Sequence, residues 1–348
     1  MVKSEKYLAM ENDAKTALEG VLAELLEIRR VQAFDKPSGN IGWDPDMVLT
    51  VRQAGKQYTL LVMVKSSGTP GAIAEFAGKA KAWGTRLSGY PVLVAPLISS
   101  RGRELCKTLG LGFVDLSGNV FLKFNGILIE KWGKEGVARE KRLQKHLFSA
   151  KATWVIRRLL SEPERKWKFE ELSTKADVSI GQAYKVVNKL VSEGYLEKER
   201  GSINLLRPGE LLDAWAEIYR FDGQEISGYY CPLKDQDEIF KGLKSMQNYA
   251  LTLGSAASLI APFVRSTDVF IYVKNDIDKL IDALNLKPVE FGGNVYLVKP
   301  RDLAVFADAQ TINGLITVSN IQLYLDLYNY PMRGREQAEH LREQVMGV

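Results

Sequence analysis

The stretch Asp44-Pro-Asp-Met-Val-Leu-Thr-Val-Arg-Gln-Ala-Gly-Lys-Gln-Tyr-Thr-Leu-Leu-Val-Met-Val-Lys65 decides the fold of the N-terminal part of the chain. Its aliphatic and β-branched residues predict two strands, over residues 47–52 and 58–65, and the short joint around Gly55 predicts a hairpin between them. Because the second strand is continuously apolar from Leu60 to Val64, we expect it in the middle of a sheet that is covered on both faces.

Helices and further strands surround this hairpin in an order typical of a mixed α/β domain. Leucine, valine and isoleucine residues at helical spacing predict a helix over residues 14–30, ahead of the hairpin. The sequence therefore predicts an α/β domain over residues 1–133. The elements expected after the hairpin are helices over residues 71–86 and 99–109, and strands over residues 90–98, 113–116, 120–124 and 127–131.

Two charged residues of the hairpin resemble part of a nuclease active site. Asp46 stands at the start of the first strand, and Lys65 stands at the end of the second. Enzymes of the restriction-endonuclease-like PD-(D/E)XK family place an acid on the first strand, and an acid and a lysine two residues apart on the second. In such a site two carboxylates hold metal ions against the scissile phosphate, and the lysine steadies the attacking water. In this chain Met63 takes the place of the second acid.

Met63 argues against catalysis, because a thioether is a poor ligand for a hard cation such as Mg²⁺, which prefers oxygen. Glu75, on the following helix, is the first candidate to supply a second carboxylate from elsewhere. The expectation is therefore a catalytically degenerate nuclease-like domain, in which Asp46, Lys65 and Glu75 mark the former site. No cofactor is predicted, and Mg²⁺, bound at Asp46, would be needed only if the site were active.

Residues 145–220 contain a pattern typical of a winged helix-turn-helix. Ser179 is placed to cap the third helix of this pattern, and Gly194 suits the left-handed residue that ends it. Two short extended segments that follow predict a β-ribbon, the wing. The predicted helices cover residues 150–161, 168–175 and 180–192, and the predicted ribbon covers residues 195–196 and 203–206.

The third helix of a winged helix enters the major groove and presents its exposed polar side chains to base edges. Helical periodicity assigns Ile180, Val187 and Leu190 to the buried side of this helix. Lysine can bond guanine, asparagine and glutamine suit adenine, and the wing would touch phosphate or the minor groove. The predicted DNA-contacting residues are Ser179, Gln182, Lys185, Asn188 and Lys189 of the third helix, and Lys198 and Arg200 of the wing.

The charge distribution also favours a nucleic-acid partner. The net charge is +5, and residues 131–168 contain twelve Lys or Arg against four Glu. Beside a DNA-binding motif such a run helps to neutralise phosphates, so we expect binding to double-stranded DNA. A winged helix that serves only for protein packing is the alternative, and Glu197 and Glu199 in the wing favour it.

The remaining composition excludes several other classes of protein. The chain has 348 residues, which predicts two or three domains. Its two cysteines, Cys106 and Cys231, lie far apart, and its two histidines, His146 and His340, form no metal-spaced cluster, so neither a structural zinc site nor a Cys–His catalytic pair is expected. The N-terminus is polar, and no apolar run approaches the roughly 20 residues of a membrane span. These features predict a cytoplasmic protein.

Residues 222–348 predict a third, α/β domain with a faint similarity to nucleotidyltransferases. Such enzymes open with a Gly-Ser pair and then place two aspartates one residue apart on a strand. Here Gly254-Ser255 precedes Asp268, and Phe270 takes the place of the second aspartate. The domain is therefore expected to be degenerate if it has this fold. The expected elements are helices over residues 250–259, 275–284, 322–328 and 336–346, a strand over residues 268–273, and a pair of strands near residues 290–298.

Several short motifs together resemble the AbiEi-type antitoxins of type IV toxin–antitoxin systems, in the branch with a restriction-endonuclease-like N-terminal domain. The resemblance implies a DNA-binding transcriptional autorepressor that opposes a nucleotidyltransferase toxin, and winged-helix regulators often act as homodimers. A metal-dependent endonuclease, or a transposase-like end-processing enzyme targeted by the winged helix, is the alternative. The motifs are Asp115-Leu-Ser-Gly-Asn119, Leu212-Asp-Ala-Trp-Ala216, Gln322-Leu-Tyr-Leu-Asp-Leu327 and Arg333-Gly-Arg-Glu-Gln-Ala-Glu339.

Overall fold

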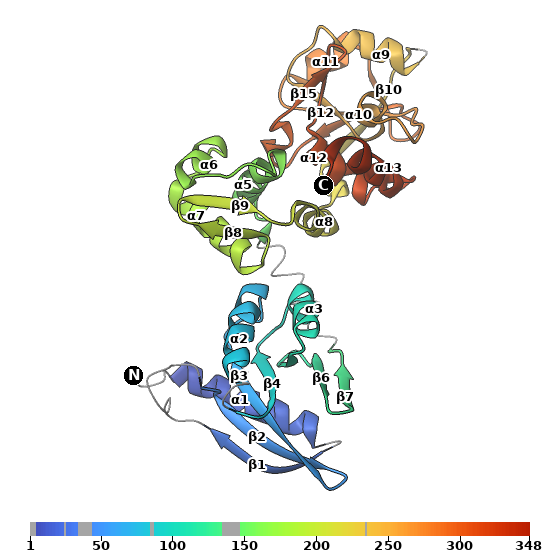
Figure 1. Ribbon diagram of the computed structural model, residues 1–348. Helices are drawn as coiled ribbons and strands as arrows, with labels where there is room; N and C mark the ends of the chain where they lie inside the picture. Colours follow the sequence, from blue (N-terminus) through green and yellow to red (C-terminus); the bar gives the residue numbers. More distant parts are fainter. Residues whose placement is uncertain (1–4, 24–25, 34–43, 84–86, 134–146, 234) are drawn as a thin grey trace. The chain divides into compact units, whose positions relative to one another are not determined.

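The computed structural model describes residues 5–23, 26–33, 44–83, 87–133, 147–233 and 235–348 and shows a mixed α/β protein of more than one compact unit (Figure 1). One unit comprises residues 1–143 with 187–196, and the other comprises residues 144–186 with 197–348. Within the described residues, each unit contains a 7-stranded sheet.

The first sheet has its strands in chain order from β1 at one edge to β7 at the other. The strands β3, β4 and β5 are parallel, and the other neighbouring pairs are antiparallel. Since β3 pairs with both β2 and β4, the central position expected for the continuously apolar strand is confirmed. The elements are α1 (Glu5–Leu22), β1 (Glu27–Ala33), β2 (Met47–Gln53), β3 (Lys56–Val64), α2 (Pro70–Trp83), β4 (Tyr90–Ala95), α3 (Ser100–Thr108), β5 (Gly112–Asp115), β6 (Val120–Phe124) and β7 (Ile127–Lys131).

Both faces of the first sheet are covered, which explains why β3 has no polar residue at its centre. Side chains alternate between the two faces of a strand. Val62 and Val64 belong to the core on the α1 side, together with Leu18. Leu61 and Met63 belong to the core formed with α2 and α3. The two cores fix the register of the sheet, because a slip by one residue would exchange them.

The helix expected over residues 14–30 is wrong in its second half. The helix α1 ends at Leu22, and Glu27–Ala33 forms the edge strand β1, antiparallel to β2. The register of this pair shifts between Ile28 and Arg30. One extra residue there places Ile28 and Val31, three positions apart, against the same core, so the bulged strand imitates helical spacing.

Three helices and a two-stranded sheet follow in the described part of the chain. The hydroxyl of Ser179 accepts a hydrogen bond from the backbone N–H of Gln182 at 3.3 Å, which confirms it as the helix cap. Gly194 has a φ of +73°, as expected of the residue that ends the third helix. The elements are α5 (Ala150–Ser161), α6 (Phe169–Lys175), α7 (Ile180–Ser192), β8 (Leu196–Glu199) and β9 (Ser202–Leu205).

The second sheet has the strand order β13-β10-β14-β12-β11-β16-β15, which includes crossovers. The helix expected from residue 250 begins only at Leu253, because Tyr249–Thr252 forms a strand that pairs with β12. The elements are α8 (Pro208–Ile218), β10 (Glu225–Tyr230), α9 (Gln236–Leu243), β11 (Tyr249–Thr252), α10 (Leu253–Ile260), β12 (Val269–Val273), α11 (Ile277–Ala283), β13 (Lys287–Pro288), β14 (Val295–Lys299), β15 (Gln310–Ile312), β16 (Leu315–Thr317), α12 (Asn320–Tyr328) and α13 (Gly334–Leu341), with a π-helical turn, Arg342–Met346, after α13.

A buried polar network joins α5 to the C-terminal elements. The Arg157 guanidinium of α5 donates to the side-chain oxygen of Gln322 on α12, and it lies 4.9 Å from the centre of the Trp215 ring of α8. This contact lies within the compact unit that contains residues 144–186 and 197–348. The division into three domains at residues 1–133, 145–220 and 222–348 stays a prediction.

The two cysteines lie in the interior of the protein, as expected. Cys106 and Cys231 are buried free thiols, and burial raises the pKa of Cys106 to about 12, so this thiol is a packing residue. Among the helices that the structure describes, none is long and apolar enough to cross a membrane.

Candidate functional site

Asp46 is tied to the neighbouring strand through its backbone and its carboxylate. Its backbone N–H donates to the carbonyl of Val62 at 2.8 Å, and its Oδ2 accepts from the N–H of Val64 at 2.8 Å. These bonds fasten the start of β2 to the end of β3. The carboxylate thus has a structural task at the position where a nuclease would use it for a metal ion.

Lys65 and Glu75 are brought together, as the hypothesis of an acid donated from α2 requires. Lys65 Nζ lies 2.9 Å from Glu75 Oε1, and Lys79 Nζ lies 2.9 Å from the same oxygen. The hydrogen bonds from Lys65 and then from Lys79 lower the pKa of Glu75. The carboxylate is therefore held ionised between two ammonium groups, which would compete with a metal ion for its lone pairs.

Met63 does not point to an open site. Its side chain is only 5% exposed and lies in the apolar core with Ile73 and Phe76 of α2. Residues two apart on a strand share a face, so Lys65 emerges at the rim of the same core. Within the described residues, no three His, Cys, Asp or Glu side chains lie together as a set that could hold a metal ion.

The Asp115–Asn119 motif forms a buried turn. Asp115 is 2% exposed, and its carboxylate accepts hydrogen bonds from the N–H groups of Ile98, Ser117 and Asn119 and from the Asn119 amide. Gly118 in this turn has a φ of +90°, which favours glycine. A carboxylate that accepts hydrogen bonds from three backbone N–H groups and one side-chain amide stabilises the turn.

The predicted DNA-contacting residues of α7 differ in exposure. Lys185 is exposed, whereas Gln182, Asn188 and Lys189 are half-buried. Lys189 Nζ also lies 3.0 Å from Glu193 Oε1, one turn further along the chain. The most accessible cation of the helix is therefore Lys185.

Ile180 and Tyr184 are exposed residues of α7 that the sequence patterns did not identify. Ile180 was expected on the buried side but is 54% exposed, and Tyr184 is 51% exposed. Ile180 stands at the first position of the helix. The position of Tyr184, next to Lys185 and one turn before Asn188, is the signal that could have revealed it.

The predicted wing residues Lys198 and Arg200 are exposed. The Lys198 ammonium lies 5.0 Å from the centre of the Tyr184 ring, so the two-stranded sheet and α7 share one surface. Gly201, with a φ of +80°, forms the turn between β8 and β9. Glu199 of the same ribbon is 3.8 Å from Lys166, which partly balances its charge.

The motif Gln322–Leu327 carries the centre of the buried network. Asp326 Oδ1 accepts from the hydroxyls of Tyr219 and Tyr272 and from the Gln322 amide, and Oδ2 accepts from the Thr252 hydroxyl. Burial raises the pKa of Asp326 to about 6 even though these donors favour its charged form. The network joins α12 to β11, to β12 and to the residue that follows α8, and sequence spacing alone could not reveal it.

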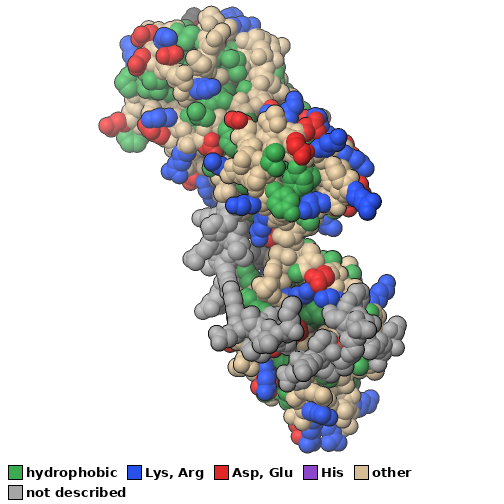
Figure 2. All heavy atoms as spheres, turned by 90° about the vertical axis from the view of Figure 1, so that its left-hand side faces the viewer, with side chains coloured by type: hydrophobic (Ala, Val, Ile, Leu, Met, Phe, Trp, Pro, Cys, Tyr) green, Lys and Arg blue, Asp and Glu red, His purple; other side chains and the backbone are tan. Residues whose placement is uncertain are grey.

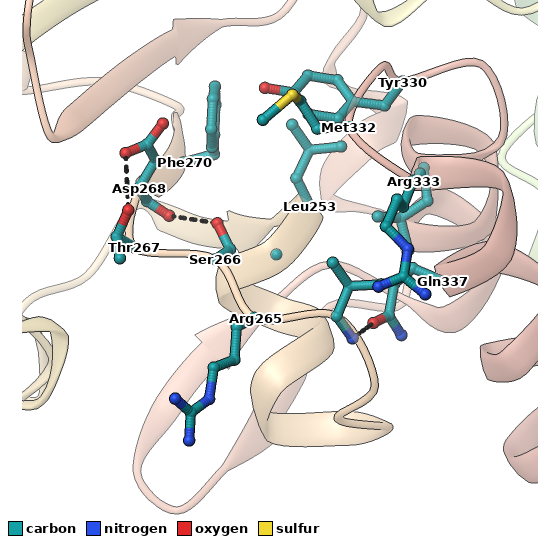
Figure 3. Close-up of a pocket in the computed structure, with 14 residues that line it drawn as sticks. Leu253, Arg265, Ser266, Thr267, Asp268, Phe270, Tyr330, Met332, Arg333 and Gln337 are labelled. Carbon is teal, nitrogen blue, oxygen red and sulfur yellow. Dashed lines mark hydrogen bonds between the residues drawn. The ribbon is translucent and has the colours of Figure 1, made fainter.

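A pocket of about 160 Å³ lies where the nucleotidyltransferase-like motif was expected (Figure 3). The Ser255 hydroxyl accepts from the N–H of Phe270 at 2.9 Å, so it joins α10 to β12. The Phe270 ring lies parallel to the Tyr296 ring with their centres 4.6 Å apart. Asp268 is the one carboxylate among the lining residues, so the pocket lacks the second acid that metal-dependent transfer requires.

Comparison with known proteins identifies the C-terminal region. Residues 204–347 match the family model described as transcriptional regulator, AbiEi antitoxin, Type IV TA system. The match begins within β9 and covers the elements from α8 to α13. This chain carries an AbiEi antitoxin region, and the resemblance expected from its motifs is confirmed there.

Two other comparisons do not identify a family for the chain. No curated protein matches the chain. A solved structure, "Structure of EndoMS in apo form", is similar at 16% identity and a TM-score of 0.23, over 33% of this chain and 46% of that one. The matched region thus spans less than half of the EndoMS chain.

Proposed function

We propose that this protein is a sequence-specific DNA-binding transcriptional regulator and the antitoxin of a type IV toxin–antitoxin system. The AbiEi match over residues 204–347 supports the class. The arrangement of α5, α6 and α7 followed by the ribbon β8–β9 supports a winged helix-turn-helix. The observation that carries the proposal is the exposed side of α7, where Tyr184 and Lys185 stand beside Lys198 of the wing.

In the proposed complex α7 lies in the major groove, with its N-terminal half against base edges. Lys185 suits the acceptors of guanine, and Gln182 and Asn188 suit adenine. Lys198 and Arg200 of the wing contact phosphate. Each phosphate contact releases counterions, so affinity falls steeply as the salt concentration rises.

Charge reversal of α7 tests the proposal. Lys185→Glu and Lys189→Glu together should abolish binding to DNA from the promoter of the protein's own gene, measured by fluorescence anisotropy over a salt series. Lys279→Glu on α11, whose side chain is 74% exposed, is the matched control and should bind like the wild type. Unchanged affinity and an unchanged salt slope in the α7 variant would exclude this helix as the reader.

The N-terminal unit is proposed to be a nuclease-like domain that no longer cuts DNA. The burial of Met63 in the apolar core supports this reading. Endonuclease activity is the second candidate function, because Lys65 and Glu75 do meet at 2.9 Å. Incubation with plasmid DNA and Mg²⁺ or Mn²⁺ distinguishes an inactive domain from an active endonuclease. Cleavage by the wild type that is lost in Asp46→Ala or Lys65→Ala would establish the endonuclease.

The partners follow from the proposed class. A nucleotidyltransferase-type toxin is the proposed counterpart, and a homodimer would match paired half-sites in the operator. The C-terminal domain itself is proposed to be inactive as a transferase, because Phe270 replaces the second acid beside Asp268. A test is to express the protein together with a nucleotidyltransferase encoded beside it, which should relieve growth arrest in the proposed role and leave it unchanged otherwise.

A further inference from the structure

The first two turns of α7 expose large apolar side chains that the core does not use. Ile180 is 54% exposed and Tyr184 is 51% exposed, while Ala183, Val187 and Leu190 of the same helix are completely buried. Residues four apart on a helix lie on the same side, so Ile180 and Tyr184 form one apolar strip. In the middle of Figure 2, a patch of exposed hydrophobic side chains lies among Lys and Arg side chains.

Gly181 lies between these two residues, and nothing inside the protein requires a glycine there. A Cβ atom built on Gly181 would have no neighbour within 4 Å, and its φ is not in the left-handed range. Glycine weakens a helix, because it has more conformational freedom to lose than alanine. A bare backbone next to exposed apolar groups suits a partner that approaches the helix closely.

Cations border the apolar strip. The Tyr184 ring lies 5.4 Å from the Phe169 ring of α6, and the Lys198 ammonium lies 5.0 Å from the Tyr184 ring. Lys185, the neighbour of Tyr184, is exposed. The surface therefore suits a partner with apolar groups that are flanked by negative charge.

The major groove of DNA has this chemistry, because its apolar group is the C5-methyl of thymine and phosphates line its edges. We propose that Ile180 and Tyr184 contact thymine methyl groups, and that Gly181 lets the backbone of α7 come close to the bases. The operator then contains thymines opposite the first two turns of α7. This inference rests on the proposed DNA-binding function and adds the chemical group that is read.

Replacing thymine by uracil tests the inference, since uracil lacks the methyl group and keeps every hydrogen bond. The full-length protein first enriches duplexes from a randomised 30-bp pool, and each thymine of the enriched sequence is then replaced singly by uracil. The wild type should lose about fourfold in affinity for each contacted methyl, the factor that burial of one such group contributes. Ile180→Ala should bind thymine and uracil duplexes equally at its position.

Lys185→Ala is the matched control, because it removes an adjacent cation and leaves the apolar strip intact. It should weaken binding to both duplexes and preserve their ratio. If every uracil duplex binds the wild type within the error of the thymine duplex, or if Ile180→Ala and Tyr184→Ala keep the wild-type ratio, the strip does not read thymine and the inference is overturned. That result leaves DNA binding itself intact. If the protein enriches no duplex at all, the proposed function fails, and this inference fails with it.

Discussion

The region around Lys65 and the exposed side of α7 both carry residues suited to nucleic acid. They differ in whether those residues already have ionic or apolar partners within the protein. Near Lys65, the Glu75 carboxylate lies between two ammonium groups, and Met63 is enclosed in the core. On α7, Ile180 and Tyr184 remain about half exposed. Groups that the chain satisfies internally stabilise the fold, whereas exposed apolar groups are available to a partner. The second region is therefore the better candidate for function.

The largest effect is expected from restoring an acid in the first region. Met63→Glu should destabilise the N-terminal unit by about 3–5 kcal/mol, because it buries a carboxylate without a partner. Chemical denaturation measures the loss, and Met63→Leu, which keeps the volume, should cost less than about 1.5 kcal/mol. A stable Met63→Glu protein that cleaves DNA with Mg²⁺ would contradict the conclusion that the region around Lys65 serves only the fold. It would support nuclease activity instead.

Truncation of a side chain on α7 should instead weaken DNA binding and should cost less stability than Met63→Glu. Tyr184→Ala should reduce affinity for an enriched DNA duplex by about tenfold, or roughly 1.4 kcal/mol, because it removes an exposed contact. Its effect on folding should be about 1–2 kcal/mol, since it loses one aromatic pair with Phe169 and one exposed cation–π contact with Lys198. Anisotropy and thermal unfolding measure the two quantities. A variant that unfolds readily and binds normally when folded would assign Tyr184 to packing.

Gly181→Ala sharpens the contrast further, because stability and binding should change in opposite directions. Alanine at a helical φ should stabilise the fold by about 0.4–1 kcal/mol through the unfolded chain. The added methyl should weaken DNA binding by keeping α7 away from the bases. Gly78→Ala on α2, where an added Cβ also has no neighbour within 4 Å, is the matched control and should stabilise without affecting binding. Equal affinity in both variants would argue against close approach at Gly181.

The smallest effect is expected from Glu75. Its pKa is lowered by Lys65 and Lys79, so its contribution to stability is present above the ordinary pKa of 4.5 and is lost as the pH falls through the lower folded value. Since the side chain is 54% exposed, Glu75→Gln should change stability by less than about 1 kcal/mol and should flatten the loss below pH 4.5. Urea unfolding between pH 3 and pH 7, relative to Glu104→Gln as a surface control, measures this; a loss of several kcal/mol would show that Glu75 is essential to the fold.

Regular patterns in the sequence predicted the elements whose periodicity reflects local geometry. The uniformly apolar strand β3 lies between two covered faces, and the cap at Ser179 and the stop at Gly194 delimit α7 as expected. The strand β1 was missed because a bulge gives a strand the spacing of a helix. The expectation that Ile180 is buried was wrong, because helical periodicity assigns each residue to a side of the helix but does not show how far along the helix the core extends.

The sequence by itself determined the α/β class, the central hairpin, the helix trio and the AbiEi likeness, because these depend on residue type and spacing along the chain. Tertiary structure decided which side chains are buried and which polar side chains have partners within the protein. Only the packing of α2 on the sheet buries Met63 and brings Glu75 to Lys65. Only the meeting of α12, β11, β12 and the residue after α8 places Asp326 among its four donors, since those donors lie from four to more than one hundred positions away in the chain. Local spacing cannot encode such contacts, because they form when distant segments share one desolvated core.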